Sequence, residues 1–184
     1  MKTPPRIRRL RAALAAVALA GVITAALAVS SAFGATRREA RLPSLDRQVL
    51  GAINAFRTRH HLVPLRLTRG LDQSAGEHSV QMGRLGYFAH SSANGTSFWQ
   101  RIQYFYRSRN YSYWSVGENL LWAAPSVSAA RAMRMWIASP EHRQNLLTAK
   151  WREIGISAVH VSNAPGIFHG DSVTIITTDF GVRH

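Results

Sequence analysis

The sequence predicts an α+β domain in which the helices come first along the chain and most strands come last. Two observations support this class. Apolar residues recur at helical spacing over much of residues 44–147, and two strand-like segments separated by turn residues close the chain. There is no internal repeat, and strands do not alternate regularly with helices, which argues against a doubly wound parallel sheet.

Helices are predicted from apolar spacing and from residues that begin or end helices. The first covers residues 45–56, with Ser44 as its N-cap. The second covers residues 71–82 and ends near Gly83 or Gly86, because glycine suits the left-handed conformation that closes many helices. The remaining helical segments are expected at residues 96–106, 126–137 and 142–147. Pro140 separates the last two of these segments.

Strands are predicted where aromatic and β-branched residues gather. They are expected at residues 111–121, which include Glu118, and at residues 153–161 and 172–180. Residues 163–166 read Asn-Ala-Pro-Gly, and these turn formers predict that the last two strands form a hairpin.

The N-terminal segment has the pattern of an export signal. Residues 12–36 carry no charge and follow a cluster of arginines at Arg6, Arg8, Arg9 and Arg11. Residues 1–35 are therefore expected to be a signal peptide, although the apolar run is also long enough for an uncleaved membrane anchor. Both interpretations place the rest of the chain outside the cytoplasm, as a secreted or cell-envelope protein. A short basic linker is expected at residues 36–43, before a domain at 44–184.

Composition excludes several kinds of site. The 184 residues contain no cysteine, which excludes a disulfide scaffold, a thiolate nucleophile and a thiolate metal site. The net charge of +14 divides equally, because residues 1–42 and residues 43–184 each carry +7. A basic domain can attract anionic lipid or cell-envelope polymers, but no dense basic run follows Arg41 and no basic-aromatic motif favours nucleic acid.

His90, Glu118 and His142 are the candidate functional residues. Brought together, two imidazoles and one carboxylate could ligate a divalent metal, exchange protons, or form a buried hydrogen-bonded cluster without chemistry. Their spacing matches no local metal motif, so the alternatives stay open. No serine lies in a Gly-x-Ser-x-Gly motif, which argues against a serine hydrolase of that type.

A set of short signatures follows in a specific order over residues 45–182. They are Asn54-Ala55-Phe56-Arg57, Leu62-Val63-Pro64-Leu65, Phe88-Ala89-His90-Ser91, Gly117-Glu118-Asn119-Leu120, Ser139-Pro140-Glu141-His142-Arg143, Glu153-Ile154-Gly155-Ile156 and Phe180-Gly181. Together they resemble the CAP superfamily, also called the SCP or pathogenesis-related-1-like domain, in its bacterial secreted branch.

The resemblance implies a three-layer α-β-α sandwich with a mainly antiparallel central sheet and an open cleft. In the wider family two histidines and two acids meet at the cleft floor, and some members bind zinc or another divalent ion. His90 and His142 fall at the histidine positions and Glu118 at one acidic position, whereas Ser139 stands at the other. This departure leaves one carboxylate fewer, so His90 and His142 are expected to hold a metal only weakly.

The resemblance therefore favours a secreted or membrane-tethered binding module without established catalysis. Its cleft, with His90, Glu118, Ser139 and His142, would hold a divalent metal or a polar ligand group, with lipid or anionic cell-envelope components as ligands. The alternative is a metal-assisted or acid-base hydrolase of the peptidase type that uses the same cleft, with Glu118 as the candidate catalytic residue. The oligomeric state is not predicted.

Overall fold

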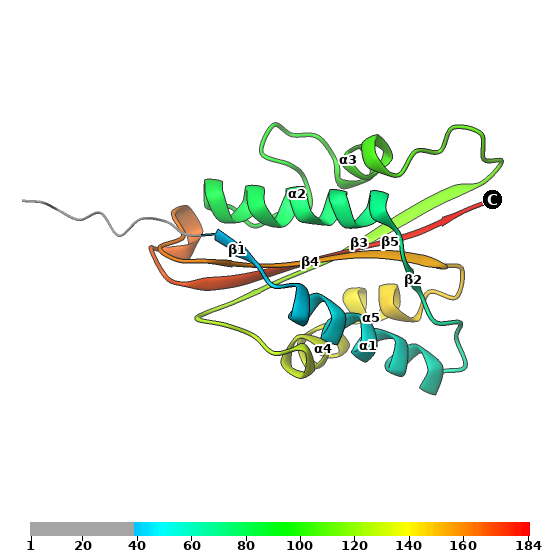
Figure 1. Cartoon of the computed structure of the whole chain (residues 1–184), viewed down its shortest axis with the longest axis horizontal. Helices are drawn as coiled ribbons and strands as arrows, with labels where there is room; N and C mark the ends of the chain where they lie inside the picture. The colour runs from blue at the N-terminus through cyan, green and yellow to red at the C-terminus, as the bar shows by residue number, and fades with distance from the viewer. Residues whose placement is uncertain (1–38) are drawn as a thin grey trace, which may run out of the picture. The chain divides into compact units, whose positions relative to one another are not determined.

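A mainly antiparallel β-sheet lies between two layers of helices, as Figure 1 shows. The computed structural model describes residues 39–184, so the predicted signal peptide or anchor at residues 1–35 lies outside the described residues. The predicted α+β class and the three-layer arrangement are confirmed. In the described part of the chain, no helix is both long and apolar enough to cross a lipid bilayer.

The sheet has the order β1-β4-β5-β3. Its strands are β1 (Glu39–Arg41), β3 (Trp114–Ala123), β4 (Glu153–Val161) and β5 (Val173–Arg183), and β2 (Arg66–Leu67) pairs with β4. Every pairing is antiparallel except that of β2 with β4. The β4–β5 hairpin predicted from the turn at residues 163–166 is present. Strand β3 lies at the end of this order, so one of its edges has no neighbouring strand among the described residues.

The helices cover both faces of the sheet. They are α1 (Pro43–Arg59), α2 (Arg69–Leu85), α3 (Phe98–Phe105), α4 (Ala129–Ala138) and α5 (Pro140–Leu147), with a short 3₁₀ helix, η1 (Gly166–Phe168). In Figure 1, α2 and α3 lie on one face, and α1, α4 and α5 lie on the other. Helix α2 ends at Gly86, whose φ of 71° is the left-handed conformation expected there.

The structure differs from the sequence prediction at the start of the domain. Residues 39–43, which the sequence assigns to a linker, instead form β1 and the start of α1. Helix α1 begins at Pro43 with Leu42 as its N-cap, so the prediction of Ser44 as N-cap is wrong. Proline suits this first turn because its missing N–H would have no helical partner there. The strands β1 and β2 are too short to show an alternating pattern in the sequence.

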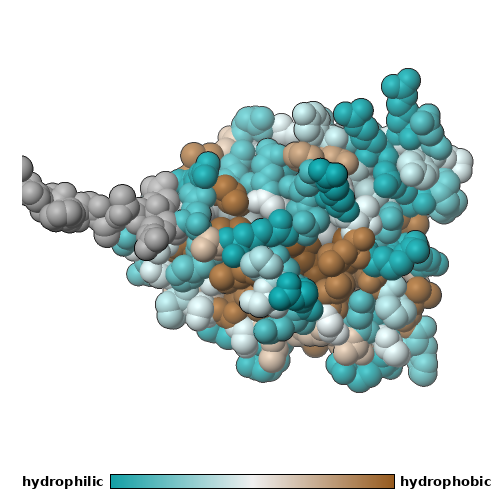
Figure 2. Space-filling view, in the orientation of Figure 1, coloured by the Kyte–Doolittle hydropathy of each residue, from teal (hydrophilic) through white to brown (hydrophobic). Residues whose placement is uncertain are grey.

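Apolar side chains fill the space on both faces of the sheet. On one face, residues of α1, α4 and α5 such as Ile53, Trp136 and Leu146 pack with β-strand residues in one cluster. On the other face, Met82 of α2 packs with Leu120 of β3 and Ile175 of β5. Figure 2 shows the outer surface of this view as mostly hydrophilic, with apolar atoms gathered in the hollow between α1 and α2. These two cores fix the sheet and thereby the positions of the loops at its edges.

Close approach of α2 to β4 gives a test of this packing. A Cβ atom on Gly155 would lie 2.0 Å from the carbonyl carbon of Leu71, where the backbone of α2 cannot yield easily. We expect Gly155→Ala to lower the free energy of unfolding by about 2 kcal/mol or more. Gly51→Ala is the matched control, because no atom lies within 4 Å of a Cβ there. In this exposed position of α1, alanine should raise stability by about 0.5–1 kcal/mol. Urea unfolding measures both values, and an equal effect of the two substitutions would contradict the packing described.

Candidate functional site

A buried carboxylate, Glu118 of β3, lies at the centre of the candidate site. Its Oε1 lies 2.8 Å from Nδ1 of His90, and when ionised it accepts a hydrogen bond from this nitrogen. The side chain of Glu118 is 1% exposed, whereas that of His90 is 54% exposed. The pair therefore joins the interior of the domain to its surface, and Nε2 is the ring nitrogen of His90 left for other partners.

Arg101 of α3 also contacts Glu118, and it is not among the site residues that the sequence predicts. Its Nη2 donates to Oε2 of Glu118, and its side chain is 4% exposed. Its Nη1 donates to the carbonyl of His90 at 3.1 Å and to Oγ of Ser92 at 3.2 Å. One guanidinium thus holds both the carboxylate and the loop that carries His90. A sequence signal exists, because Arg101 lies three residues after Phe98 on the apolar side of a short helix.

A buried histidine on α2 supports the same loop. His78 is fully buried, and its Nε2 lies 2.9 Å from the carbonyl oxygen of Ala89, the residue before His90. Burial lowers the pKa of His78 to about 3, and the positive charge of Arg101 contributes to this lowering. His78 is therefore neutral at physiological pH, and its role is to fix the backbone beside His90.

A second buried carboxyl group, Asp179 of β5, lies next to Glu118 in the sheet. The two residues are partners in the β3–β5 register, and Asp179 is fully buried. Burial raises the pKa of Asp179 well above its ordinary value, and the charge of Glu118 raises it further. Burial also raises the pKa of Glu118 to about 7, against the opposing charge of Arg101. With only one guanidinium for two carboxyl groups, Asp179 keeps its proton and Glu118 is the group that ionises.

Two asparagines position His142 relative to Glu118. Nδ2 of Asn119 donates to the carbonyl of His142 at 3.0 Å, and Nδ2 of Asn145 donates to the carbonyl of Glu118 at 3.0 Å. A third bond joins Asn145 to Oδ1 of Asn119. Gly117 is required at this point, because a Cβ there would lie 2.7 Å from Oδ1 of Asn145. The Gly-Glu-Asn signature therefore fastens α5 to β3 at the unpaired edge of the sheet.

The two candidate imidazoles share one electrostatic environment. Burial lowers the pKa of His90, and the charge of Arg101 lowers it further. Burial also lowers the pKa of His142, and a positive charge on His90 lowers it further. Both rings are therefore neutral at physiological pH, and a neutral ring can donate one hydrogen bond and accept another.

Ser139 and His142 lie in a pocket along the free edge of β3. The pocket has a volume of about 260 Å³, and its other lining residues are apolar or aromatic: Phe88, Leu120, Leu121, Trp122, Met135 and Trp136. Nε1 of Trp136 donates to the carbonyl of Leu120 at 3.0 Å, and Asn145 binds that of Glu118. These bonds occupy two carbonyl groups of β3. The edge is therefore less able to pair with another strand, and it forms one side of an apolar pocket instead.

The residues present do not fit a resident zinc site with three protein ligands. Both oxygens of Glu118 already have partners, His90 and Arg101. In residues 39–184, no group of three or more His, Asp or Glu side chains is placed to hold a metal ion. A catalytic zinc normally has three protein ligands and a structural zinc four. Among the described residues of this site, the two imidazoles of His90 and His142 are left as candidate ligands.

Comparison with known proteins gives a family match and several similar folds. The family model of CAP, the cysteine-rich secretory protein family, matches residues 50–175. An outer surface protein from Borrelia burgdorferi has a TM-score of 0.64 at 19% identity, and the match covers 81% of this chain and 100% of that one. An extracellular SCP-domain protein from Bacillus anthracis has a TM-score of 0.58 at 23% identity, with 75% of this chain and 40% of that one covered.

Two relatives from Bacillus subtilis are similar in sequence over part of their length. The uncharacterized protein YkwD is 27% identical over 124 residues, which is 67% of this chain and 46% of that protein. The uncharacterized membrane protein YlbC is 27% identical over 111 residues, or 60% of this chain and 30% of that protein. This chain therefore spans less than half of the length of either relative.

The proton held by Asp179 gives a test of the buried carboxyl pair. Above about pH 4, the unfolded chain releases this proton while the folded protein retains it, because folding raises the pKa from 3.8. The contribution of this one proton to the free energy of unfolding should therefore fall as the pH rises, by at most about 1.4 kcal/mol per pH unit. Asp179→Asn removes this dependence, so its stability relative to the wild type should increase between about pH 4 and pH 7. Urea unfolding across this range measures the difference, and parallel pH profiles would refute the assignment.

Proposed function

This chain belongs to the cysteine-rich secretory protein family (CAP), and we propose that it is a secreted or membrane-tethered binding module for an amphipathic, anionic ligand. The polar group of the ligand binds at His90 and His142, and its apolar part enters the pocket along β3. One observation supports the proposal most strongly. The neutral imidazole of His142 lines an apolar pocket of about 260 Å³, so a polar and an apolar group of one ligand can bind side by side. Export rests on the predicted signal or anchor at residues 1–35, and the intact mass of the native protein distinguishes cleavage from anchoring.

The polar end of the site can recognise a ligand without a metal ion. Glu118 accepts the Nδ1 hydrogen of His90, so Nε2 is available as an acceptor. The ring of His142 supplies the second neutral imidazole, and Ser139 adds a hydroxyl on the same pocket wall. The N–H of His142 and the hydroxyl of Ser139 can donate to a carboxylate or a phosphate ester, whereas Nε2 of His90 can accept from a hydroxyl. The charge of residues 43–184, with fifteen Lys and Arg against eight Asp and Glu, favours an anionic head group.

The apolar end of the site supplies binding energy without a specific partner group. Met135 is 40% exposed and lines the pocket with Trp122 and Trp136. Burying such surface under an acyl chain removes it from water, which is favourable by about 25 cal/mol per Å². A lipid-like ligand therefore fits both ends of the site.

A hydrolase that uses His90 is the second candidate function. The contact from Glu118 to Nδ1 holds the imidazole as a carboxylate holds a general base in many hydrolases. In residues 39–184, no serine or threonine hydroxyl is hydrogen-bonded to His90 or His142, so an attacking water would be the nucleophile. Turnover of p-nitrophenyl laurate that is lost in a Glu118→Gln variant would favour this function over simple binding.

Laurate is the probe that tests the binding function. The fluorescence of the pocket tryptophans should change on titration with laurate below its micelle concentration. His142→Ala removes a polar partner, and Met135→Glu places a charge in the apolar pocket. Each should weaken binding by about tenfold. Val63→Glu is the control, because Val63 is 54% exposed and lies outside the pocket. If the wild type does not bind laurate, or if all three variants reduce the affinity for laurate equally, the proposal is wrong.

Divalent-metal binding by His90 and His142 stays a proposal of its own. With Glu118 already paired, we expect zinc to bind weakly, with a dissociation constant well above micromolar. Calorimetry should detect this binding in the wild type and lose it in the His90→Ala/His142→Ala double variant. Equal heats from both proteins would exclude the histidines as ligands, and tight binding would require a third ligand.

A further inference from the structure

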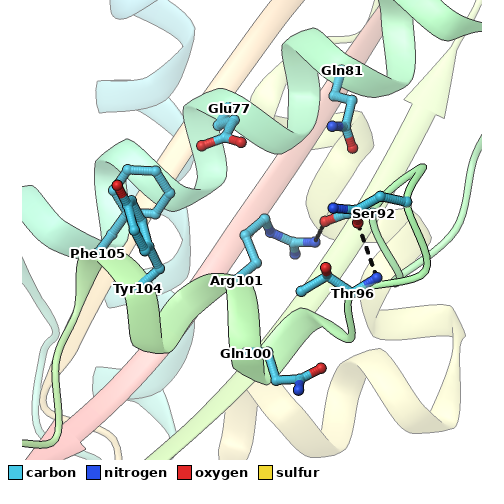
Figure 3. Close-up of a pocket in the computed structure, with 9 residues that line it drawn as sticks. Glu77, Gln81, Ser92, Thr96, Gln100, Arg101, Tyr104 and Phe105 are labelled. Atoms are coloured by element: carbon cyan, nitrogen blue, oxygen red, sulfur yellow. Dashed lines mark hydrogen bonds between the residues drawn. The ribbon is translucent and has the colours of Figure 1, made fainter.

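A second pocket lies between α2 and α3, and Arg101 is one of its lining residues. Figure 3 shows it with Glu77 and Gln81 projecting from α2, and Arg101 and Tyr104 from α3. Its volume is about 610 Å³, and it shares no lining residue with the pocket along β3. The binding function proposed above makes no use of it.

The polar wall of this pocket presents amide hydrogens of fixed orientation. Oε1 of Gln81 accepts the backbone N–H of Ala93 at 3.0 Å, so its NH₂ group is the end left for a ligand. The amide oxygen of Asn94 likewise accepts the backbone N–H of Thr96 at 3.0 Å.

The third amide is fixed by a helix cap. Oε1 of Gln100 accepts the backbone N–H of Ser97 at 3.2 Å as part of the capping box of α3. Three NH₂ donors from different segments thus line one pocket. Their orientation is set before any ligand arrives, which reduces the entropy lost on binding.

One acceptor and one aromatic surface complete the wall. Within residues 39–184, the carboxylate of Glu77 has no hydrogen bond or ion pair. Tyr104 is 70% exposed and is held edge-to-face against Phe105, with ring centroids 4.9 Å apart. An exposed ring held in place offers a flat apolar surface beside the polar groups.

These features exclude several classes of ligand. An anion would meet the free carboxylate of Glu77, and the charge of Arg101 is already balanced by Glu118. A metal cation would find a single carboxylate, which is too few ligands. An acyl chain would leave the amide and carboxylate groups without partners, which is unfavourable when they are buried.

We propose that the pocket between α2 and α3 binds a neutral saccharide chain. Sugar hydroxyls both donate and accept, so they match three amide donors and one carboxylate together. The C–H face of a pyranose ring packs on Tyr104, and an N-acetyl group adds a carbonyl acceptor for an amide and an N–H donor for Glu77. Only a ligand with polar edges and an apolar face satisfies both parts of this wall.

Oligosaccharide titration of the full-length chain tests the proposal. A detergent without a sugar head group, such as lauryldimethylamine oxide, keeps the chain in solution without competing for the pocket. The probes are chitotetraose and cellotetraose as neutral saccharides, tetragalacturonate as an anionic one, and tetra-alanine as a peptide. Calorimetry and saturation-transfer NMR should detect a neutral saccharide, with weaker binding of tetragalacturonate and none of tetra-alanine.

Two variants and one control locate the binding. Tyr104→Ala should reduce the affinity for the neutral saccharide by about tenfold, and Glu77→Gln should reduce it by several-fold. Trp99→Ala is the matched control, because Trp99 is a 45% exposed aromatic residue of the same helix outside the pocket. No binding of either neutral saccharide, preferred binding of tetra-alanine, or equal effects of Tyr104→Ala and Trp99→Ala would overturn the proposal.

Discussion

The buried carboxylate of Glu118 is the constraint on which the arrangement of the site depends. When ionised, it carries one negative charge inside the domain, and Arg101 and His90 are the groups that satisfy it. A buried charge without partners is strongly destabilising, so α3 and the loop after α2 must close over β3 in one geometry. His90 is positioned at the surface as a consequence, with one ring nitrogen inward and the other available.

Residues next to this site line two pockets of different chemistry. One is the apolar pocket along β3, where Ser139 stands beside His142. The polar pocket between α2 and α3 has Arg101 itself among its lining residues. Because Ser139 adds no charge and Glu118 is fully paired, the first pocket lacks the acidic character that a tightly held cation needs. Under the two proposals above, the domain has one amphipathic and one polar ligand surface.

Sequence alone predicts much of this fold but only part of the site. Helix α2 and the β4–β5 hairpin follow from long apolar patterns and from turn residues, whereas β1 and β2 are too short to leave a pattern. His90 and Glu118 were identified by their residue types and signatures. Asp179 was not, because its role comes from its pairing with Glu118 across two strands, which no local pattern reveals. Arg101 differs from Asp179, because its place on the apolar side of a short helix is visible in the sequence, whereas its partner Glu118 is not.

The tautomer of His90 tests the central constraint most directly. Nitrogen NMR of the imidazole should be measured about one pH unit above the Glu118 pKa of about 7, where the carboxylate is ionised. If Glu118 holds the ring as described, the proton resides on Nδ1, and this preference is lost when Glu118 is replaced by glutamine. A wild-type ring that carries its proton mainly on Nε2 would contradict the account.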